Sequence, residues 1–340
     1  MKVSVFGSGA WGTAIALLLR DNGNSVTIWS KFEDEAKNLK STRENPLLKG
    51  IVIPDDIHIT SDIEEATVGV GAAIIAVPSF AVRETSFALA GWMDESCDVI
   101  CMSKGIEKDT SSLFTGILRD TLGAHVPIAS VSGPTHAEEV AQRMPTACVS
   151  ASEDIDVAER VQGLLMNDYF RVYTSTDVVG VELGAALKNV IALSAGVCDG
   201  LGLGDNTIAM LMTRGLAEMA GLSVRMGGRK ETLAGLAGLG DLIVTCMSQH
   251  SRNRRAGVLI GKGMTAQEAM AQVGAVVEGY YAAKAAHELA GKVGVDMPIC
   301  TEAYRVLFEE KSPLDAMRDL MGRQRKMENS DGEERWVLGN

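Results

Sequence analysis

The sequence predicts an α/β fold in which a mostly parallel sheet is followed by a second, all-helical domain. In the first half, short apolar strands alternate with helical segments and end in short polar loops, as in a sheet covered by helices on both faces. From about Asp177 the strand pattern stops and apolar residues recur at helical spacing. The 340 residues, 46% of them hydrophobic, suffice for two domains, which we place at residues 1–176 and 177–326. The polar, unpatterned residues 327–340 are expected to form a mobile tail.

The chain opens with an apolar strand that runs directly into a glycine turn, KVSVFGSGAWG at residues 2–12. Gly7 permits a sharp turn, Gly9 lets a pyrophosphate approach the backbone, and Gly12 lets the following helix pack closely on the sheet. That helix would point free N–H groups and its positive dipole end at the anion. Because Ser25–Trp29 adds a second strand and completes a βαβ unit, the turn predicts a dinucleotide site in a Rossmann-type, doubly wound sheet.

Further strands follow in order, and several of them end in polar loops. We expect a polar helix at residues 33–39, strands at 72–77, 98–103 and 127–132, and two more strands at 146–150 and 170–174 that are separated by a helix. Ligands of open parallel sheets bind beyond the carboxyl ends of the strands. Lys104 and Gly133 lie in such loops and are therefore candidate site residues.

In the second domain, apolar residues at helical spacing predict helices at residues 183–198, 207–226, 266–273, 280–293 and 301–308. Lys188 lies in the first of these, on a face whose other residues are small or apolar. A lysine that extends to solvent needs a polar edge, whereas small neighbours let another surface approach. Burial would depress the pKa of Lys188 toward neutrality, as a general acid or base requires. From spacing alone, a catalytic and a structural lysine both remain open.

Two later stretches carry polar groups that need a partner of opposite charge or a hydrogen-bonding partner. Asp241 lies in the glycine-rich apolar segment GLAGLGDLIV, where an unpaired carboxylate would be costly to bury. It needs a cation, and Lys188 or Lys104 could serve. The run SRNRR at residues 251–255 brings hydroxyl, amide and guanidinium donors together, which suits a phosphate. A solvated basic loop would have the same composition.

Composition excludes several classes of function. The net charge of -12 and the isoelectric point near 5.0 argue against a general affinity for nucleic acid or anionic membranes. Six cysteines without a C-x-x-C pair are typical of reduced thiols, and five histidines without a tight ligand spacing argue against a metal site. The chain enters a core strand within two residues, so we expect no signal peptide and a cytoplasmic protein. The longest apolar run, residues 68–82, is too short to span a bilayer and is interrupted by Pro78.

A series of motifs resembles the NAD(P)-dependent glycerol-3-phosphate dehydrogenase family in its bacterial, cytosolic form. These motifs are GSGAWGTA, NPLLKGI, SKGIE, SGPTHAEE, LKNVIAL, GDNT, TRGLAEM, GLAGLGDLIVTC, SRNRRAG and VVEG. The similarity spans about residues 2–326. It implies reversible reduction of dihydroxyacetone phosphate to sn-glycerol 3-phosphate by NADH or NADPH, a supply for glycerophospholipid synthesis, and a homodimer.

The resemblance also implies roles for individual residues. Lys188 would be the proton donor and acceptor, Lys104 would contact cofactor and substrate, and Asp241 would orient the substrate hydroxyls. The expected cofactor-binding residues are Gly7, Gly9, Ala10, Trp11, Gly12, Lys31, Lys104, Ala137, Arg252, Val276 and Glu278. The expected substrate-binding residues are Lys104, Gly133, Thr135, Lys188, Asp241, Ser251, Arg252 and Asn253. Two of these depart from the family pattern, since Ala10 and Thr135 each replace a usual serine, and Thr135 retains the hydroxyl.

The end of the second strand bears on the choice of cofactor. NAD-specific sites usually place Asp or Glu about twenty residues beyond the glycine turn, where it binds the ribose 2′-hydroxyl. Here the strand ends in Ser30 and Lys31, which could bind a 2′-phosphate, whereas Glu33 and Asp34 lie farther along. We therefore expect NADPH to be used at least as well as NADH. A solvent-facing Lys31 without a role is the alternative.

Two other functions are alternatives to the glycerol-3-phosphate dehydrogenase hypothesis. A related reductase or β-hydroxyacid dehydrogenase would combine the same two domains with a catalytic lysine, but it would select a carboxylate substrate, a hydroxy or keto acid. A non-catalytic nucleotide sensor would share the glycine turn, yet it would give no reason to place Lys188 and Asp241 in apolar surroundings.

Overall fold

The computed structural model describes residues 1–325 and 327–328. The chain divides into two compact units, Met1–Lys104 with Ser112–Glu182, and Gly105–Ser111 with the chain from Leu183 on. The division falls within the long helix α8 (Val178–Gly200). The mobile tail expected at residues 327–340 lies outside the described residues, apart from residues 327 and 328.

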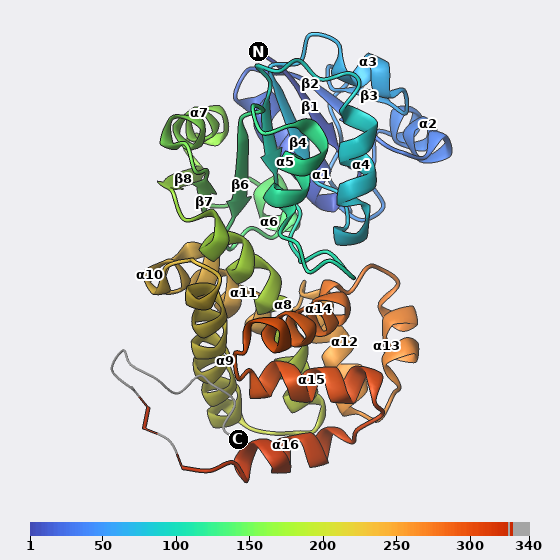
Figure 1. The fold of residues 1–340 in the computed structure, drawn as a ribbon. Coiled ribbons are helices and arrows are strands. Elements are labelled where there is room, and N and C mark those ends of the chain that lie inside the picture. The colour runs from blue at the N-terminus through green and yellow to red at the C-terminus, as the bar shows by residue number, and fades with distance from the viewer. Residues whose placement is uncertain (326, 329–340) are drawn as a thin grey trace. The chain divides into compact units, whose positions relative to one another are not determined.

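The first unit is built on one sheet in the order β3-β2-β1-β4-β5-β6-β7-β8 (Figure 1). The strands are β1 (Lys2–Phe6), β2 (Ser25–Trp29), β3 (His58–Thr60), β4 (Ala72–Ile75), β5 (Asp98–Cys101), β6 (Ile128–Ser132), β7 (Thr146–Ala151) and β8 (Phe170–Ser175). Strands β1 to β6 are parallel, β7 is antiparallel to β6, and β8 is parallel to β7. The doubly wound fold is thereby confirmed. The sequence missed β3 because three residues are too few to show a pattern.

Helices cover both faces of this sheet. They are α1 (Ala10–Asp21), α2 (Glu33–Thr42), α3 (Ile63–Thr67), η1 (Ser79–Ala81), α4 (Val82–Leu89), α5 (Phe114–Leu122), α6 (Ala137–Ala141) and α7 (Ile155–Leu165). Buried residues of α1, α6 and α7 pack on one face, and those of α3, α4 and α5 pack on the other. In Figure 1, α4 and α5 lie in front of the strands. Cover on two sides explains why the strands appear as continuous apolar runs in the sequence.

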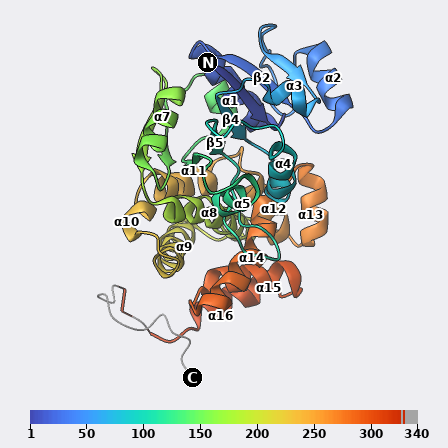
Figure 2. The same cartoon turned by 45° about the horizontal axis from the view of Figure 1, so that its top comes forward.

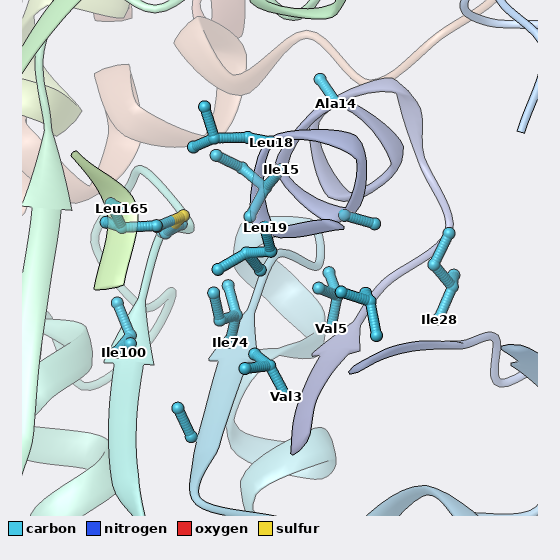
Figure 3. Packing of buried hydrophobic residues seen from close by; sticks show 14 of the residues in the cluster. Val3, Val5, Ala14, Ile15, Leu18, Leu19, Ile28, Ile74, Ile100 and Leu165 are labelled. Atoms are coloured by element: carbon cyan, nitrogen blue, oxygen red, sulfur yellow. The ribbon is translucent and has the colours of Figure 1, made fainter. Parts of the chain in front are cut away.

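Helix α1 packs directly on the strand that precedes it. Figure 3 shows Ile15, Leu18 and Leu19 of α1 above Val3 and Val5 of β1. All five side chains are at most 1% exposed. Each such burial stabilises the fold by about 1.5–3 kcal/mol relative to exposure. The glycine turn between β1 and α1 is therefore held firmly at both of its ends.

The second unit is helical in the part of the chain that the structure describes. Beyond α8, its helices are α9 (Asp205–Arg225), α10 (Lys230–Leu233), the π-helix η2 (Leu236–Gly240), α11 (Asp241–Met247), α12 (Arg252–Gly261), α13 (Ala266–Val273), α14 (Glu278–Val293), α15 (Pro298–Phe308) and α16 (Pro313–Met321). Figure 2 shows α14, α15 and α16 in succession, each in contact with the next. The five expected helices correspond to α8, α9, α13, α14 and α15. Apolar spacing missed the others because α10 and α11 are short, and because glycine or charged residues interrupt the pattern in η2, α12 and α16.

Helix α8 is the core helix of the second unit. Its length and hydropathy would suffice to cross a membrane, but 89% of the apolar window is buried inside the folded chain. It approaches α12 closely through glycine. A Cβ atom added at Gly196 would lie 2.1 Å from the carbonyl oxygen of Arg254, and one added at Gly257 would lie 2.0 Å from that of Leu193. Glycine therefore sets the distance between α8 and α12.

A buried carboxylate joins α9 to the beginning of α15. Glu218, 5% exposed, accepts hydrogen bonds from the backbone N–H of Ile299 at 2.8 Å and of Cys300 at 3.3 Å. Burial raises the pKa of Glu218 from 4.5 to about 8, although the two N–H donors oppose this shift. Between about pH 4.5 and pH 8, Glu218 is therefore protonated in the folded chain and ionised in the unfolded chain.

We expect the stabilisation by Glu218 to depend on pH. Because its folded-state pKa is raised, its contribution is complete below about pH 4.5 and is lost as the pH rises through about 8, by up to about 1.4 kcal/mol per pH unit. The free energy of unfolding of the wild type minus that of Glu218→Gln should therefore decrease across this window. Urea denaturation at several pH values measures it, and a difference that does not change with pH would contradict the expectation.

Candidate active site

The glycine turn between β1 and α1 has the geometry that the sequence predicts. Gly7 has a φ of +124°, and a Cβ atom there would lie 2.4 Å from the carbonyl oxygen of Ala76. A Cβ atom at Gly12 would lie 2.0 Å from the carbonyl oxygen of Gly7. At Gly9, by contrast, a Cβ atom would meet nothing within 4 Å. Gly7 and Gly12 are thus required by the backbone, whereas the space beside Gly9 is open.

The beginning of α1 fits a pyrophosphate. Gly9 is the N-cap of α1, and no side chain caps the helix, so the N–H groups of Ala10 and Trp11 remain available to an anion. Trp11 also buries its indole Nε1 atom, which has no hydrogen-bond partner among the described residues. Open space beside a glycine, together with uncapped N–H groups, is what a dinucleotide needs at this position.

The loops after β4, β5 and β6 are linked by hydrogen bonds. Lys104 donates from Nζ to the carbonyl oxygen of Gly133 at 3.0 Å and to Oγ1 of Thr135 at 3.4 Å. Ser103 donates to the carbonyl oxygen of Val77 at 2.6 Å. The expectation that these loops border one region at the carboxyl ends of the strands is confirmed. Ser103 had no signal in the sequence beyond its place in that loop.

Gly133 and Ala137 also have structural reasons for their identity. A Cβ atom at Gly133 would lie 2.7 Å from the Cα atom of Cys148 on β7, so the close approach of two chain segments requires glycine there. Ala137 is the first residue of α6, which has no side-chain cap. Neither observation tests contact with substrate or cofactor, so their binding roles stay predictions.

At the end of β2, both groups expected to meet a 2′-phosphate already have partners. Ser30 donates from Oγ to Oε2 of Glu35 at 2.7 Å, and Lys31 donates from Nζ to Oε1 of Glu84 at 2.5 Å. Glu33 lies within α2, as the sequence suggested. The sequence missed Glu35 and Glu84 because each reaches the strand end only through the folding of its helix.

In the second unit, Lys188 is buried against a carboxylate. Lys188 is 5% exposed and Asp241 is 1% exposed, and the Lys188 ammonium donates to Oδ1 of Asp241. The same ammonium donates to Oγ1 of Thr245 at 2.9 Å. Of the two cations proposed for Asp241, the structure therefore selects Lys188. The expected apolar face is correct for α8 itself, but α11 adds a carboxylate and a hydroxyl, and the carboxylate stabilises the ammonium form.

Glycine residues bring Asp241 to this position. A Cβ atom at Gly184 of α8 would lie 2.5 Å from the carbonyl oxygen of Ala237, and one at Gly238 would lie 2.1 Å from that of Leu233. The wider π-helical turn of η2 ends at Gly240, and Asp241 begins α11. π-Helical turns are frequent at functional sites because they shift the side chains that follow. Within the segment GLAGLGD, Gly238 is thus required by close backbone packing.

The basic run expected at residues 251–255 begins a helix and is not a loop. Ser251 is the N-cap of α12 and accepts a hydrogen bond from the backbone N–H of Arg254 at 3.2 Å. Arg252 is exposed at the first position of α12 and has no ion-pair or hydrogen-bond partner among the described residues. A free guanidinium beside a helix N-terminus is a suitable site for an anion.

Asn253 is buried and joins three helices of the second unit. Its amide donates to Oδ1 of Asn189 on α8 at 2.8 Å, and its Oδ1 accepts the N–H of Gly279 on α14 at 2.8 Å. Glu278 begins α14, and Val276 precedes it. The sequence missed Asn189, although it stands next to Lys188 in the LKN motif. Asn253 therefore has a structural role in addition to the binding role that stays a prediction.

A hollow of about 990 Å³ lies elsewhere in the first unit, near the amino ends of β1 and β5. Its arginines are already paired, Arg143 with Asp21 at 2.9 Å and Arg160 with Asp98 at 2.7 Å. We place no site there because these charged groups satisfy one another. In the part of the chain that the structure describes, no group of three His, Cys, Asp or Glu side chains is arranged to hold a metal ion.

Comparisons with known proteins agree with this arrangement. Family models described as the NAD-dependent glycerol-3-phosphate dehydrogenase N-terminus and C-terminus match residues 2–158 and 177–318. Proteins named glycerol-3-phosphate dehydrogenase [NAD(P)+] are 50% identical in Agathobacter rectalis, over 97% of this chain and 98% of the relative, and 47% identical in Fusobacterium nucleatum, over 96% and 98%. The crystal structure of glycerol-3-phosphate dehydrogenase from Coxiella burnetii covers 95% of this chain and 99% of its own at 37% identity, with a TM-score of 0.92.

Gly12→Ala should disrupt the glycine turn. The added Cβ atom has no room against the carbonyl oxygen of Gly7, so we expect a loss of stability of about 1–3 kcal/mol and weaker binding of NADH. Gly163→Ala is the matched control, because Gly163 lies in α7 with nothing within 4 Å of an added Cβ atom. Thermal denaturation and NADH fluorescence measure both effects. Equal behaviour of the two variants would disprove the steric argument.

Thr245→Val should misplace the Lys188 ammonium. Valine keeps the shape of threonine but removes the hydroxyl that accepts from Lys188, so we expect turnover to fall about tenfold to a hundredfold, since a buried donor loses its partner at about 1–3 kcal/mol. Thr245→Ser keeps the hydroxyl and should retain most of the turnover. If valine and serine reduced turnover equally, the hydroxyl would have no part in placing Lys188.

Proposed function

The chain belongs to the NAD-dependent glycerol-3-phosphate dehydrogenase family, and from that premise we propose that it reduces dihydroxyacetone phosphate reversibly to sn-glycerol 3-phosphate with NADH or NADPH. The observation that carries this proposal is the buried Lys188 ammonium, held by Asp241 and Thr245. A buried and doubly oriented lysine is suited to proton transfer in a way that a surface lysine is not.

We assign cofactor binding mainly to residues 1–176. The open space beside Gly9 and the uncapped N–H groups of α1 support this assignment. The proposed cofactor contacts are Gly7, Gly9, Ala10, Trp11, Gly12, Lys31, Lys104 and Ala137, with Arg252, Val276 and Glu278 from residues 177–326. When bound, the nicotinamide supplies the hydride that reduces the ketone carbon.

Lys188 is the proposed proton donor. As the ketone is reduced, negative charge develops on the carbonyl oxygen, and the Lys188 ammonium donates a proton to that oxygen. In the oxidative direction the neutral amine accepts the proton again. Asp241 pairs with the Lys188 ammonium and orients the substrate hydroxyl, and Lys104 adds positive potential. Thr245 holds the Nζ atom from its other side.

Residues at the beginning of α12 are the proposed phosphate site. Arg252 offers a guanidinium that no ion pair or hydrogen bond engages within the described residues, and the helix N-terminus adds the positive end of its dipole. Ser251 and Asn253, both buried, lie beside Arg252 in the chain. Binding energy from the phosphate end, which does not react, holds the ketone in a reactive geometry, so this site should affect turnover as well as affinity.

Four finer points belong to the same proposal. NADPH is used at least as well as NADH, with the partly exposed Lys31 ammonium, which is paired with Glu84, as the group that would meet the 2′-phosphate. The protein acts as a homodimer. It works in the cytoplasm. Its product supplies glycerophospholipid synthesis.

The test is the fall in nicotinamide absorbance when dihydroxyacetone phosphate is added, with hydroxy and keto acids as alternative substrates. Lys188→Ala should lower turnover by about a hundredfold or more, because the proton donor is removed, while NADPH binding stays nearly intact, because Lys188 is not among the proposed cofactor contacts. Lys230→Ala is the control, since Lys230 is an exposed lysine in the same unit. Near-normal turnover in Lys188→Ala would reduce Lys188 to a structural residue.

Arg252→Ala should remove the preference for a phosphorylated substrate. We expect kcat/KM for dihydroxyacetone phosphate to fall by the equivalent of roughly 2–5 kcal/mol and kcat/KM for dihydroxyacetone, which lacks the phosphate, to fall much less, so that discrimination between the two ketones decreases. Arg255→Ala provides the control, because Arg255 is exposed in the same helix. Unchanged discrimination between the two ketones would place the phosphate elsewhere.

A further inference from the structure

The end of β2 holds one hydroxyl and one ammonium, and carboxylates from two helices engage both. Ser30 accepts from the backbone N–H of Phe32 at 3.3 Å and donates its single proton to Glu35 at 2.7 Å. A serine hydroxyl has only one proton to give. Ser30 can therefore donate to a 2′-phosphate only if it gives up its hydrogen bond to Glu35. The group at this strand end that can attract the phosphate by charge is the ammonium of Lys31.

Glu84 occupies that cation. The carboxylate of Glu84, in the first turn of α4, lies 2.5 Å from Nζ of Lys31. The side chains of Lys31 and Glu84 are 49% and 66% exposed, so neither is locked in place by packing. Exposed pairs of this kind are weak, typically below about 1 kcal/mol, and an incoming anion can replace the carboxylate.

We propose that Glu84 is a specificity-determining residue that sets the ratio of NADPH to NADH use by competing with the 2′-phosphate for Lys31. The inference rests on the proposed function, since it concerns the cofactor of the same site. NADPH binding must exchange the Lys31–Glu84 pair for a Lys31–phosphate pair and leaves the Glu84 carboxylate near a second anion. NADH carries a hydroxyl at that position and requires no such exchange. Glu84 therefore lowers the affinity for one cofactor and leaves the other unchanged.

A purely structural role for Glu84 predicts a different result. An acidic residue in the first turn of a helix interacts favourably with the helix dipole. If that were its only role, its removal would lower the stability of α4 and would affect both cofactors alike. The ratio of the NADP+ and NAD+ affinities therefore distinguishes the two roles. Thermal stability, measured beside it, shows whether the substitution has weakened α4.

The experiment measures the dissociation constants of NADP+ and NAD+ by calorimetry for the full chain, which requires no turnover. Glu84→Gln should tighten NADP+ binding about two- to fivefold, the scale of an exposed ion pair, and leave NAD+ binding unchanged. Glu153→Gln is the matched control. Glu153 is also 66% exposed and is paired with Arg119 at 2.9 Å, on the segment before α7. It should change neither constant.

A second variant tests whether Glu84 acts through Lys31. Lys31→Met should weaken NADP+ binding. Glu84→Gln should then increase the NADP+ affinity of the Lys31→Met variant by a smaller factor than it increases the NADP+ affinity of the wild type. Two results would overturn the inference: an unchanged ratio of the NADP+ and NAD+ dissociation constants in Glu84→Gln, or an equal gain in NADP+ affinity with and without Lys31. As long as both cofactors still bind, such a result would leave the proposed function standing. If the wild type binds neither cofactor, the inference and the proposed function fail together.

Discussion

The buried pair of Lys188 and Asp241 is the interaction on which the second unit depends most. Moving two charges out of water costs several kcal/mol per ion, and their attraction offsets this only when the geometry is good and further hydrogen bonds are made. Thr245 provides such a bond. Because removing one partner would strand the other charge, α8 and α11 must keep their relative positions. The demand for charge balance thus holds the Lys188 ammonium in place.

Close backbone packing at glycine sets the distances between the elements that carry the polar groups of both units. In the first unit, Gly7 and Gly12 bring β1, β4 and α1 together, and α1 begins without a side-chain cap because its N-cap residue is Gly9. In the second, Gly196 and Gly257 bring α8 and α12 together, and α12 begins with Arg252. Both helices therefore present an N-terminus that is suited to an anion. The same physical device appears in two unrelated folds within one chain.

Most of the architecture could be predicted from local pattern, and the exceptions have identifiable causes. Long apolar runs marked the central strands because helices cover both faces of the sheet. Strand β3 and helix α12 escaped, the first because it has three residues and the second because charges and glycines dominate it. The sequence singled out Arg252 as an anion-binding candidate, which stays a prediction, but its place at the start of a helix, where a dipole assists it, emerged only from the fold.

What the sequence by itself determined are features whose parts lie close together in the chain, such as the glycine turn, the alternation of strands and helices, and the LKN and SRN groups. What only the tertiary structure decided are pairings across long separations. Lys188 and Asp241 are 53 residues apart, and so are Lys31 and Glu84. Spacing along one element tells which face a residue occupies, but the partner depends on which other element packs there. That choice is made by the burial of apolar surface over the whole unit, a property that no short stretch of sequence contains.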